Sequence, residues 1–159
     1  TGKEDGGMTS VPTLNGQVIG QAERATRAVL DVLLERTRTS FHQWVVLNRV
    51  ALSGGTLSQE QLTRDMTHGL KVTPDVVEAA AGGVVEAGFA ERRPDGSLTL
   101  TPAGDAKFRE IRDGIAEISA RLYGDIPAED LAVAQRVLTT VTARANEELA
   151  RVHGTRENA

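Results

Sequence analysis

The sequence predicts a mainly α-helical protein: a winged helix-turn-helix with a small β-hairpin wing, plus N- and C-terminal helices that mediate dimerisation. Three observations support this fold class. Apolar residues recur at helical spacing over most of the chain. Two short helical segments near the middle are joined by a tight turn, which is typical of a helix-turn-helix. A hairpin signal, Asp95-Gly96, follows them directly. A hairpin in that place is the wing of a winged helix.

The first predicted helix runs from Leu14 to about Arg36. Its apolar residues recur every three or four positions, at Val18, Ala22, Ala25, Val29, Val32 and Leu33. The Thr/Ser-rich stretch TRTS ends it, and we assign residues 14–39 to a dimerisation helix. A second helix, FHQWVVLNRVAL, is expected to place Trp44 and Leu47 on one face and to stop at the SGG turn.

The helix-turn-helix belongs to a predicted winged-helix domain at residues 40–104. Ser58 is expected to cap its first helix, and Gln61 is expected to complete a capping box. Thr73 followed by Pro74 predicts the start of its second helix. That helix, TPDVVEAAAGGVVEAG, is the segment expected to read DNA. After it, FAERR and SLTLT predict the two strands of the wing, and Thr101 is expected to cap the next helix.

The C-terminal part of the chain, residues 105–153, predicts two further helices separated by YGDIP. Their apolar stripes are narrow and regular, as in coiled-coil seams. Together with the first helix they predict a dimerisation layer. Its expected contacts are Val29, Leu33, Ile111, Ile115, Ile118, Leu122, Leu131, Leu138, Val141 and Leu149.

The composition limits the class of protein. The 159 residues favour one domain, or one domain with helical extensions. A formal net charge of −4 argues against a surface that binds nucleic acid everywhere, but it allows a local basic patch. The sequence has no cysteine, which excludes disulfides, thiolate metal sites and cysteine nucleophiles.

Localisation and the chain ends are expectations of the same kind. No apolar run approaches the ~18 residues that a membrane helix needs, so we expect no contact with a membrane. The N-terminal TGKEDGGMTS is polar and unlike a signal peptide, which favours a cytoplasmic location. Residues 1–13 and 154–159 are expected to be tails, the first of them disordered.

The order of the elements resembles that of the multiple-antibiotic-resistance regulator (MarR) family of bacterial transcription factors. The resemblance covers roughly Val18 to Val152 and rests on four phrases, QWVVLNRVALSGGTLSQEQLTRDM, VVEAGFAERR, LTLTPAG and LYGDIPAEDLAVAQRVLTTV. It implies a homodimer whose two winged helices dock in successive major grooves of a pseudo-palindromic, double-stranded operator. It also implies a repressor that a small, often aromatic, effector releases from DNA.

The helix expected to read DNA departs from the family pattern. Family members tend to carry Ser, Thr and Arg on its outer face, whereas this helix has no Lys or Arg and three carboxylates. Val76 could still touch a thymine methyl group, and Glu78 could accept from a cytosine amino group. Carboxylates near phosphates are repelled, however. The candidate DNA contacts of the helix-turn-helix are Arg64, Lys71, Thr73, Asp75, Val76, Glu78 and Ala79.

The wing departs from the family pattern as well, because its hairpin is shorter and its tip is PDG. Arg92 and Arg93, just before the tip, are candidates for contact with phosphate or a minor groove. They could equally be solvated surface arginines. The pair Gly82-Gly83 could allow close packing, a kink or flexibility. These departures leave a second function open: a ligand- or protein-binding module that has kept the fold with weak or lost DNA binding.

The resemblance also implies an effector cavity near Phe41, His42 and Trp44, with Tyr123 as a possible wall. Trp44 could stack on an aromatic effector and His42 could bind its carboxylate or hydroxyl group. The alternatives are that Trp44 is a core residue, His42 a surface residue and Tyr123 a packing residue between helices. The three histidines lack metal-ligand spacing, and HExxH, GxSxG and P-loop motifs are absent. We therefore predict no enzyme activity, no metal and no cofactor.

Overall fold

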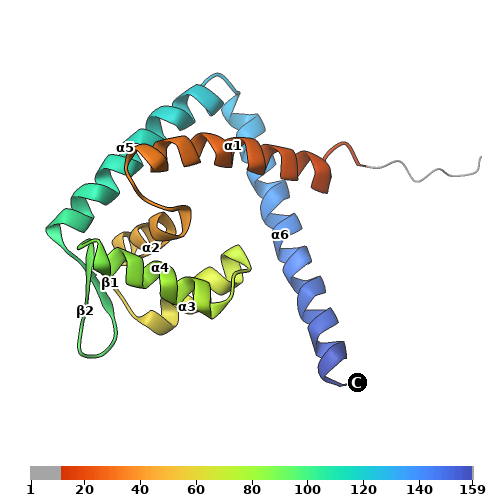
Figure 1. The fold of residues 1–159 in the computed structure, drawn as a ribbon. Coiled ribbons are helices and arrows are strands. Elements are labelled where there is room, and N and C mark those ends of the chain that lie inside the picture. Colours follow the sequence, from red (N-terminus) through yellow and green to blue (C-terminus); the bar gives the residue numbers. More distant parts are fainter. Residues whose placement is uncertain (1–11, 159) are drawn as a thin grey trace, which may run out of the picture. The chain divides into compact units, whose positions relative to one another are not determined.

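The computed structural model describes residues 12–158, and within them it contains six helices and one antiparallel three-stranded sheet (Figure 1). The predicted fold class is confirmed. The part of the predicted N-terminal tail up to residue 11 lies outside the described residues. The helices are α1 (Gly16–Arg36), α2 (Phe41–Leu52), α3 (Gln59–Leu70), α4 (Pro74–Glu86), α5 (Pro102–Tyr123) and α6 (Ala128–Glu157). The strands are β1 (Thr56–Leu57), β2 (Ala90–Arg92) and β3 (Leu98–Leu100).

The chain divides into two compact units, Thr1–Ile118 and Ser119–Ala159. The first unit holds the helix-turn-helix, the wing, α1 and most of α5, so the division does not fall at the predicted domain boundary after residue 104. Phe108 explains the difference, because its ring stacks on Trp44 of α2 with centroids 5.8 Å apart. Ile111, one turn further along α5, is fully buried. It is therefore a core residue of this unit, which corrects its assignment to the dimerisation seam.

The core of the first unit forms around α2, which buries four of its residues and packs against both α3 and α4. Trp44 is only 8% exposed and belongs to this core. The buried apolar residues are Leu34, Trp44, Val46, Leu47, Val50, Leu62, Met66, Val77, Ala80, Ala81, Val84, Ala90, Leu98, Phe108 and Ile111. Small and branched side chains dominate this set, because only 3% of the residues in the chain are aromatic.

Side-chain caps fix where α2 and α3 begin. At α2, the Ser40 hydroxyl accepts from the Gln43 amide and the Gln43 side chain accepts from the Ser40 amide, both at 3.1 Å, which is a complete capping box. At α3, Ser58 accepts from the Gln61 amide at 3.1 Å as predicted. The Gln61 side chain instead donates to Asp65, at 2.8 Å. The predicted capping box at Ser58 is therefore only half formed.

The sheet has the strand order β1-β3-β2, and its first strand is not predicted by the sequence patterns. Gly54 and Gly55, with φ of +79° and +94°, turn the chain after α2. The turn brings Thr56 opposite Thr99 and Leu57 opposite Leu98. Two residues are too few to show the alternation by which a strand is identified in a sequence.

In the second unit, α6 continues to Glu157, beyond the predicted end at residue 153. This helix has 30 residues, all of them described, and buries none of its side chains. Its exposed large apolar residues are Val133, Val137, Leu138, Val141, Leu149 and Val152. No helix among residues 12–158 is long and apolar enough to cross a membrane.

Candidate nucleic-acid interface

Helix α4 is seated in the first unit by one apolar face. Val77, Ala80, Ala81 and Val84 are buried on that side. The exposed positions include Thr73, Asp75, Glu78, Ala79 and Glu86, while Val76 is half-buried. Pro74 occupies the first turn as predicted, and Thr73 stands at the N-cap position without a capping hydrogen bond from its side chain among the described residues. The face turned to solvent is therefore the one expected to read DNA.

The two glycines within α4 have different surroundings. A Cβ added at Gly83 would come within 2.5 Å of the Gln43 side-chain nitrogen, so Gly83 allows α2 and α4 to approach closely. A Cβ at Gly82 would meet no atom within 4 Å in the part of the chain that the structure describes. Close packing, one of the three alternatives for this pair, thus applies to Gly83 alone.

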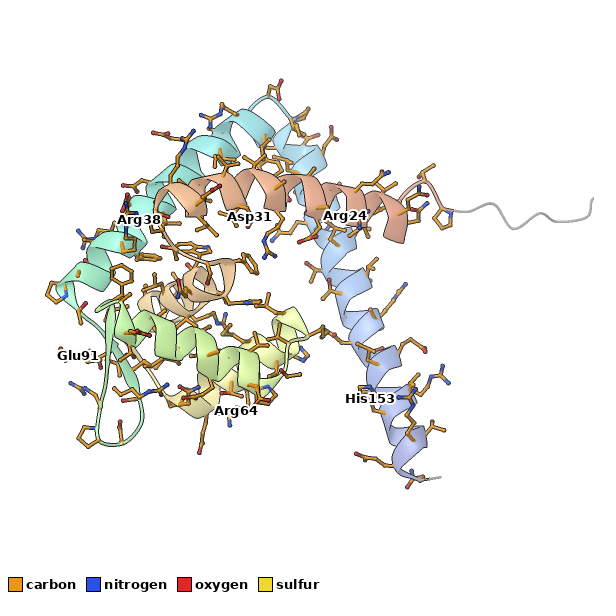
Figure 2. All side chains as sticks on the ribbon, viewed as in Figure 1. Arg24, Asp31, Arg38, Arg64, Glu91 and His153 are labelled. Carbon is orange, nitrogen blue, oxygen red and sulfur yellow. The ribbon has the colours of Figure 1, made fainter. Side chains whose placement is uncertain are left out.

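Arg92 connects the wing to both helices of the helix-turn-helix. One guanidinium nitrogen donates to Gln59 Oε1 at 2.9 Å, and the other donates to Glu78 Oε1 at 2.8 Å. Side chains alternate between the two faces of a strand, so Arg92 shares a face of β2 with the buried Ala90. That face is turned towards the helices, whereas Glu91 lies on the outer side of the wing, away from α4 (Figure 2).

The ion pair between Arg92 and Glu78 contributes little to stability, but it alters the charge on the exposed face of α4. The Arg92 side chain is 33% exposed and the Glu78 side chain 62% exposed. An ion pair at such a surface contributes about 0.2–1 kcal/mol to stability. Its second effect is electrostatic, because the positive charge of Arg92 offsets the negative charge of Glu78 on the exposed face of α4. Two carboxylates of α4, Asp75 and Glu86, lie nearer its ends.

The tip of the wing is a tight turn that begins at Arg93. Its amide donates to the carbonyl of Ser97 at 2.8 Å, and Gly96, with φ of +84°, donates to the Arg93 carbonyl at 2.9 Å. Asp95 Oδ1 accepts from both the amide and the hydroxyl of Ser97, which holds the pKa of Asp95 below its usual value. The hairpin predicted at Asp95-Gly96 is confirmed. Unlike Arg92, Arg93 stands beyond the strand, and it is exposed.

Arg64 lies on the exposed side of α3, and Lys71 is the exposed residue at its C-terminal end. Figure 2 shows Arg64 at the edge of the first unit opposite α1, where its guanidinium donates to Gln61 Oε1 at 2.8 Å. Lys71 ends α3 in a left-handed conformation, with φ of +58°, and its ammonium group donates to the His68 carbonyl at 2.5 Å. Both side chains reach solvent next to α4 in the chain, as a phosphate contact requires.

The four residues predicted to line an effector site have different surroundings. Trp44 is in the core, and the ring of Phe41 is covered by the Arg27 guanidinium, whose central carbon lies 3.2 Å from the ring centroid. His42 lines an open hollow of about 350 Å³ between the start of α2 and α4. The other residues of the hollow are Ser40, Gln43, Val76, Ala79 and Ala80. Tyr123 lies in the second unit and is exposed.

The remaining dimerisation candidates differ in exposure. Val29, Leu122, Leu138, Val141 and Leu149 are exposed. Leu33, Ile115, Ile118 and Leu131 are half-buried. Leu33 also packs within the first unit, since a Cβ added at Gly114 of α5 would come within 2.8 Å of it. These residues stay candidates, whereas Ile111 does not.

The geometry of the first unit is that of a winged helix-turn-helix, with α3 and α4 as the helix pair and β2–β3 as the wing. Comparison with solved structures identifies the whole fold as that of the MarR-family transcriptional regulators. The reduced form of MarR from E. coli superposes with a TM-score of 0.64 at 19% identity, covering 83% of this chain and 94% of that one.

Two further solved structures carry ligands. A Mycobacterium tuberculosis MarR-family protein in complex with salicylic acid has a TM-score of 0.60 at 22% identity, covering 82% of this chain and 99% of its own. CouR from Rhodococcus jostii, bound to p-coumaroyl-CoA, has a TM-score of 0.70 at 14% identity, with coverages of 80% and 90%. No family model and no curated protein matches the sequence.

Proposed function

We propose that this protein is a homodimeric, cytoplasmic transcriptional regulator, a repressor that binds a pseudo-palindromic DNA operator under the control of a small aromatic effector. The observation that carries the proposal is the seating of α4. One face of this helix is buried against α2 and α3, and the opposite face is exposed to solvent. Arg92 of the wing donates a hydrogen bond to Glu78 on the exposed face. This is the arrangement that a helix needs to enter a major groove while a wing follows the backbone. The proposal includes no catalytic activity.

Within this proposal, bases and phosphates are contacted by different parts of the surface. The outer face of α4, with Thr73, Asp75, Val76, Glu78 and Ala79, lies in the major groove. Arg64 and Lys71 at α3, together with Arg93 at the wing tip, contact phosphates on either side. Arg92 differs from the expectation that we drew from the sequence. Each terminal nitrogen of its guanidinium donates to a protein partner, and in this proposal Arg92 shapes the interface instead of anchoring a phosphate.

The exposed apolar stripe of α6 supports the homodimer. A 30-residue helix that leaves six large apolar side chains exposed is stabilised by covering that stripe. The regular seam spacing suits a second helix of the same kind. A twofold dimer then presents two copies of α4 to two half-sites, which is why the operator is expected to be a pseudo-palindrome.

The hollow beside His42 supports control by an effector. Two of its lining residues, the half-buried Val76 and the exposed Ala79, are candidate DNA contacts on α4. A molecule bound there would cover part of the surface that reads DNA. One of the two similar structures holds salicylic acid, an aromatic carboxylate, and the other holds p-coumaroyl-CoA, an aromatic thioester. His42 is the side chain of this hollow that can pair with a carboxylate such as that of salicylate.

The test measures binding of the purified protein to its own upstream intergenic DNA and to a scrambled duplex, at several salt concentrations. We expect tight binding to the first, weaker binding to the second, and an affinity that falls with salt. Arg93→Ala should weaken binding to both duplexes and lower the salt slope by about one per subunit. The matched control is Arg109→Ala, since Arg109 on α5 is also exposed and is paired with Asp105. Equal effects of the two substitutions would contradict the wing contact.

A second function, a ligand- or protein-binding module on the same fold, is favoured by one observation. Helix α4 has no Lys or Arg, and Asp75, Glu78 and Glu86 are all exposed. If the protein binds neither duplex even at low salt, this second function replaces the first.

A further inference from the structure

We propose that Glu78 is a base-reading residue that selects cytosine, and that Arg92 is the positioning residue that orients it. This inference rests on the proposed DNA binding and deepens it, because it names the base and the side chain that recognises it. The bridge from Arg92 to Glu78 and Gln59 joins three elements, β2, α4 and α3.

The geometry leaves Glu78 both fixed and accessible. Its Oε1 accepts from Arg92 at 2.8 Å, yet the side chain is 62% exposed. A carboxylate has room for about four hydrogen bonds, so one donor leaves most of its acceptor capacity available. Glu78 also lies one turn into α4, and the first turns of a recognition helix are the ones that reach base edges.

The chemistry of the major groove selects the base. An ionised carboxylate only accepts hydrogen bonds, and the donors on base edges are the amino groups of cytosine and adenine. In adenine the acceptor N7 stands beside the amino group and repels a carboxylate, so that edge suits an amide, which both donates and accepts. Cytosine offers its amino group without such a neighbour. Glu78 therefore matches cytosine.

Arg92 makes this contact possible in two ways. A lone carboxylate is repelled by the phosphates, and the guanidinium cancels that charge within the interface. The planar guanidinium of Arg92 also donates to Glu78 and Gln59 at the same time, and two thirds of the Arg92 side chain is covered. A lysine would supply the charge but could not reproduce the two directed bonds. Arg92 thus acts through Glu78 and needs no contact with DNA of its own.

The experiment compares four proteins, the wild type, Glu78→Gln, Arg92→Lys and Glu91→Gln. Glu91→Gln is the matched control, because it removes the same charge from the outer side of the wing. Base preference is first determined by selection from a randomised duplex pool at fixed salt. Affinities are then measured for the selected duplex and for one in which the preferred C·G pair of each half-site is replaced by T·A, since thymine presents an acceptor where cytosine presents a donor.

We expect the wild type to select cytosine at one position of each half-site and to lose about 5- to 150-fold in affinity for each half-site changed to T·A, so that the two losses multiply in the duplex with both changes. Glu78→Gln should abolish this preference, Arg92→Lys should reduce it, and Glu91→Gln should preserve it. If Glu78→Gln tightens binding to every duplex alike, Glu78 is only a repulsive surface charge and the inference is overturned, while the proposed function stands. If the wild type selects no sequence, the proposed function fails and the inference fails with it.

Discussion

Replacing Gly104 with alanine should destabilise the protein, because the start of α5 is pressed against the chain before β2. A Cβ at Gly104 would lie 1.8 Å from the Phe89 carbonyl oxygen. Ordinary carbon–oxygen contacts are about 3.3 Å or longer, so α5 or Phe89 must move by about 1.5 Å. The same oxygen accepts from the Thr101 amide at 3.1 Å, and that bond would be lost.

The expected cost combines overpacking, about 1–3 kcal/mol, with one lost hydrogen bond, about 0.5–1.5 kcal/mol. A total of about 2–4 kcal/mol lowers the Tm of a chain of this size by about 5–15 °C. The assay is thermal unfolding followed by circular dichroism at one fixed protein concentration, because the Tm of a protein that dimerises depends on concentration.

Gly82→Ala provides the matched control for this prediction. The substitution is chemically the same, but a Cβ at Gly82 meets no described atom within 4 Å. It should stabilise the protein by about 0.4–1 kcal/mol, since alanine favours the helix and restricts the unfolded chain. If Gly104→Ala leaves Tm unchanged or raises it as Gly82→Ala does, the close approach of α5 to Phe89 is refuted.

Three further predictions concern the core, an ion pair and the dimer. Trp44→Ala should cost about 3–5 kcal/mol in urea unfolding, because a buried aromatic ring is replaced by a cavity. The Arg49 guanidinium holds the pKa of Asp65 below its usual value of 3.8, so this pairing stabilises the fold above that pH and is lost as pH falls through the lowered pKa. The stability deficit of Arg49→Ala should therefore be present at neutral pH and shrink in acid unfolding curves below 3.8. Leu138→Glu should shift the protein to monomers in sedimentation experiments, whereas an unchanged dimer would exclude the α6 stripe as the interface.

The sequence predicts most of the fold because its signals are local. Periodicity, helix caps and the Asp95-Gly96 turn depend on neighbours in the chain, and so the helices and the hairpin were found at nearly their observed positions. The strand β1 was missed because Thr56 and Leu57 become a strand only by pairing with β3. The assignment of Ile111 was wrong because its spacing fits both a dimer seam and the core, and only the stacking of Phe108 on Trp44 decides between them.

The exposed face of α4 was predictable from the sequence, but the hydrogen bonds that join it to the wing were not. The sequence Glu91-Arg92-Arg93 predicts which arginine faces the helices. Side chains alternate along a strand, so Arg92 points to the opposite face from both of its neighbours. Pairing with the register of β3 then puts Arg92 beside Leu98, on the buried side. Its partners Gln59 and Glu78, however, lie 33 and 14 residues away, and no local pattern connects them.

The salt dependence of DNA binding tests how an acidic helix approaches a polyanion. In this structure the helix contributes no cation, and one of its carboxylates is already cancelled by Arg92. In the proposed complex, attraction to phosphate comes from Arg64, Lys71 and Arg93. With three cations per subunit, a dimer would make about six phosphate contacts, and log K should fall with log salt at a slope of about −5.

If Arg92 also bound phosphate, the two extra contacts of a dimer would bring the slope to about −7. Arg92→Lys distinguishes these cases further. A lysine freed from Glu78 could reach a phosphate, so a steeper slope in this variant than in the wild type would show that the bridge holds Arg92 away from the backbone. A wild-type slope near −7 that becomes shallower in Arg92→Ala would show the reverse. The wing arginine would then leave Glu78 when DNA binds, and the carboxylate would face the groove without its cation.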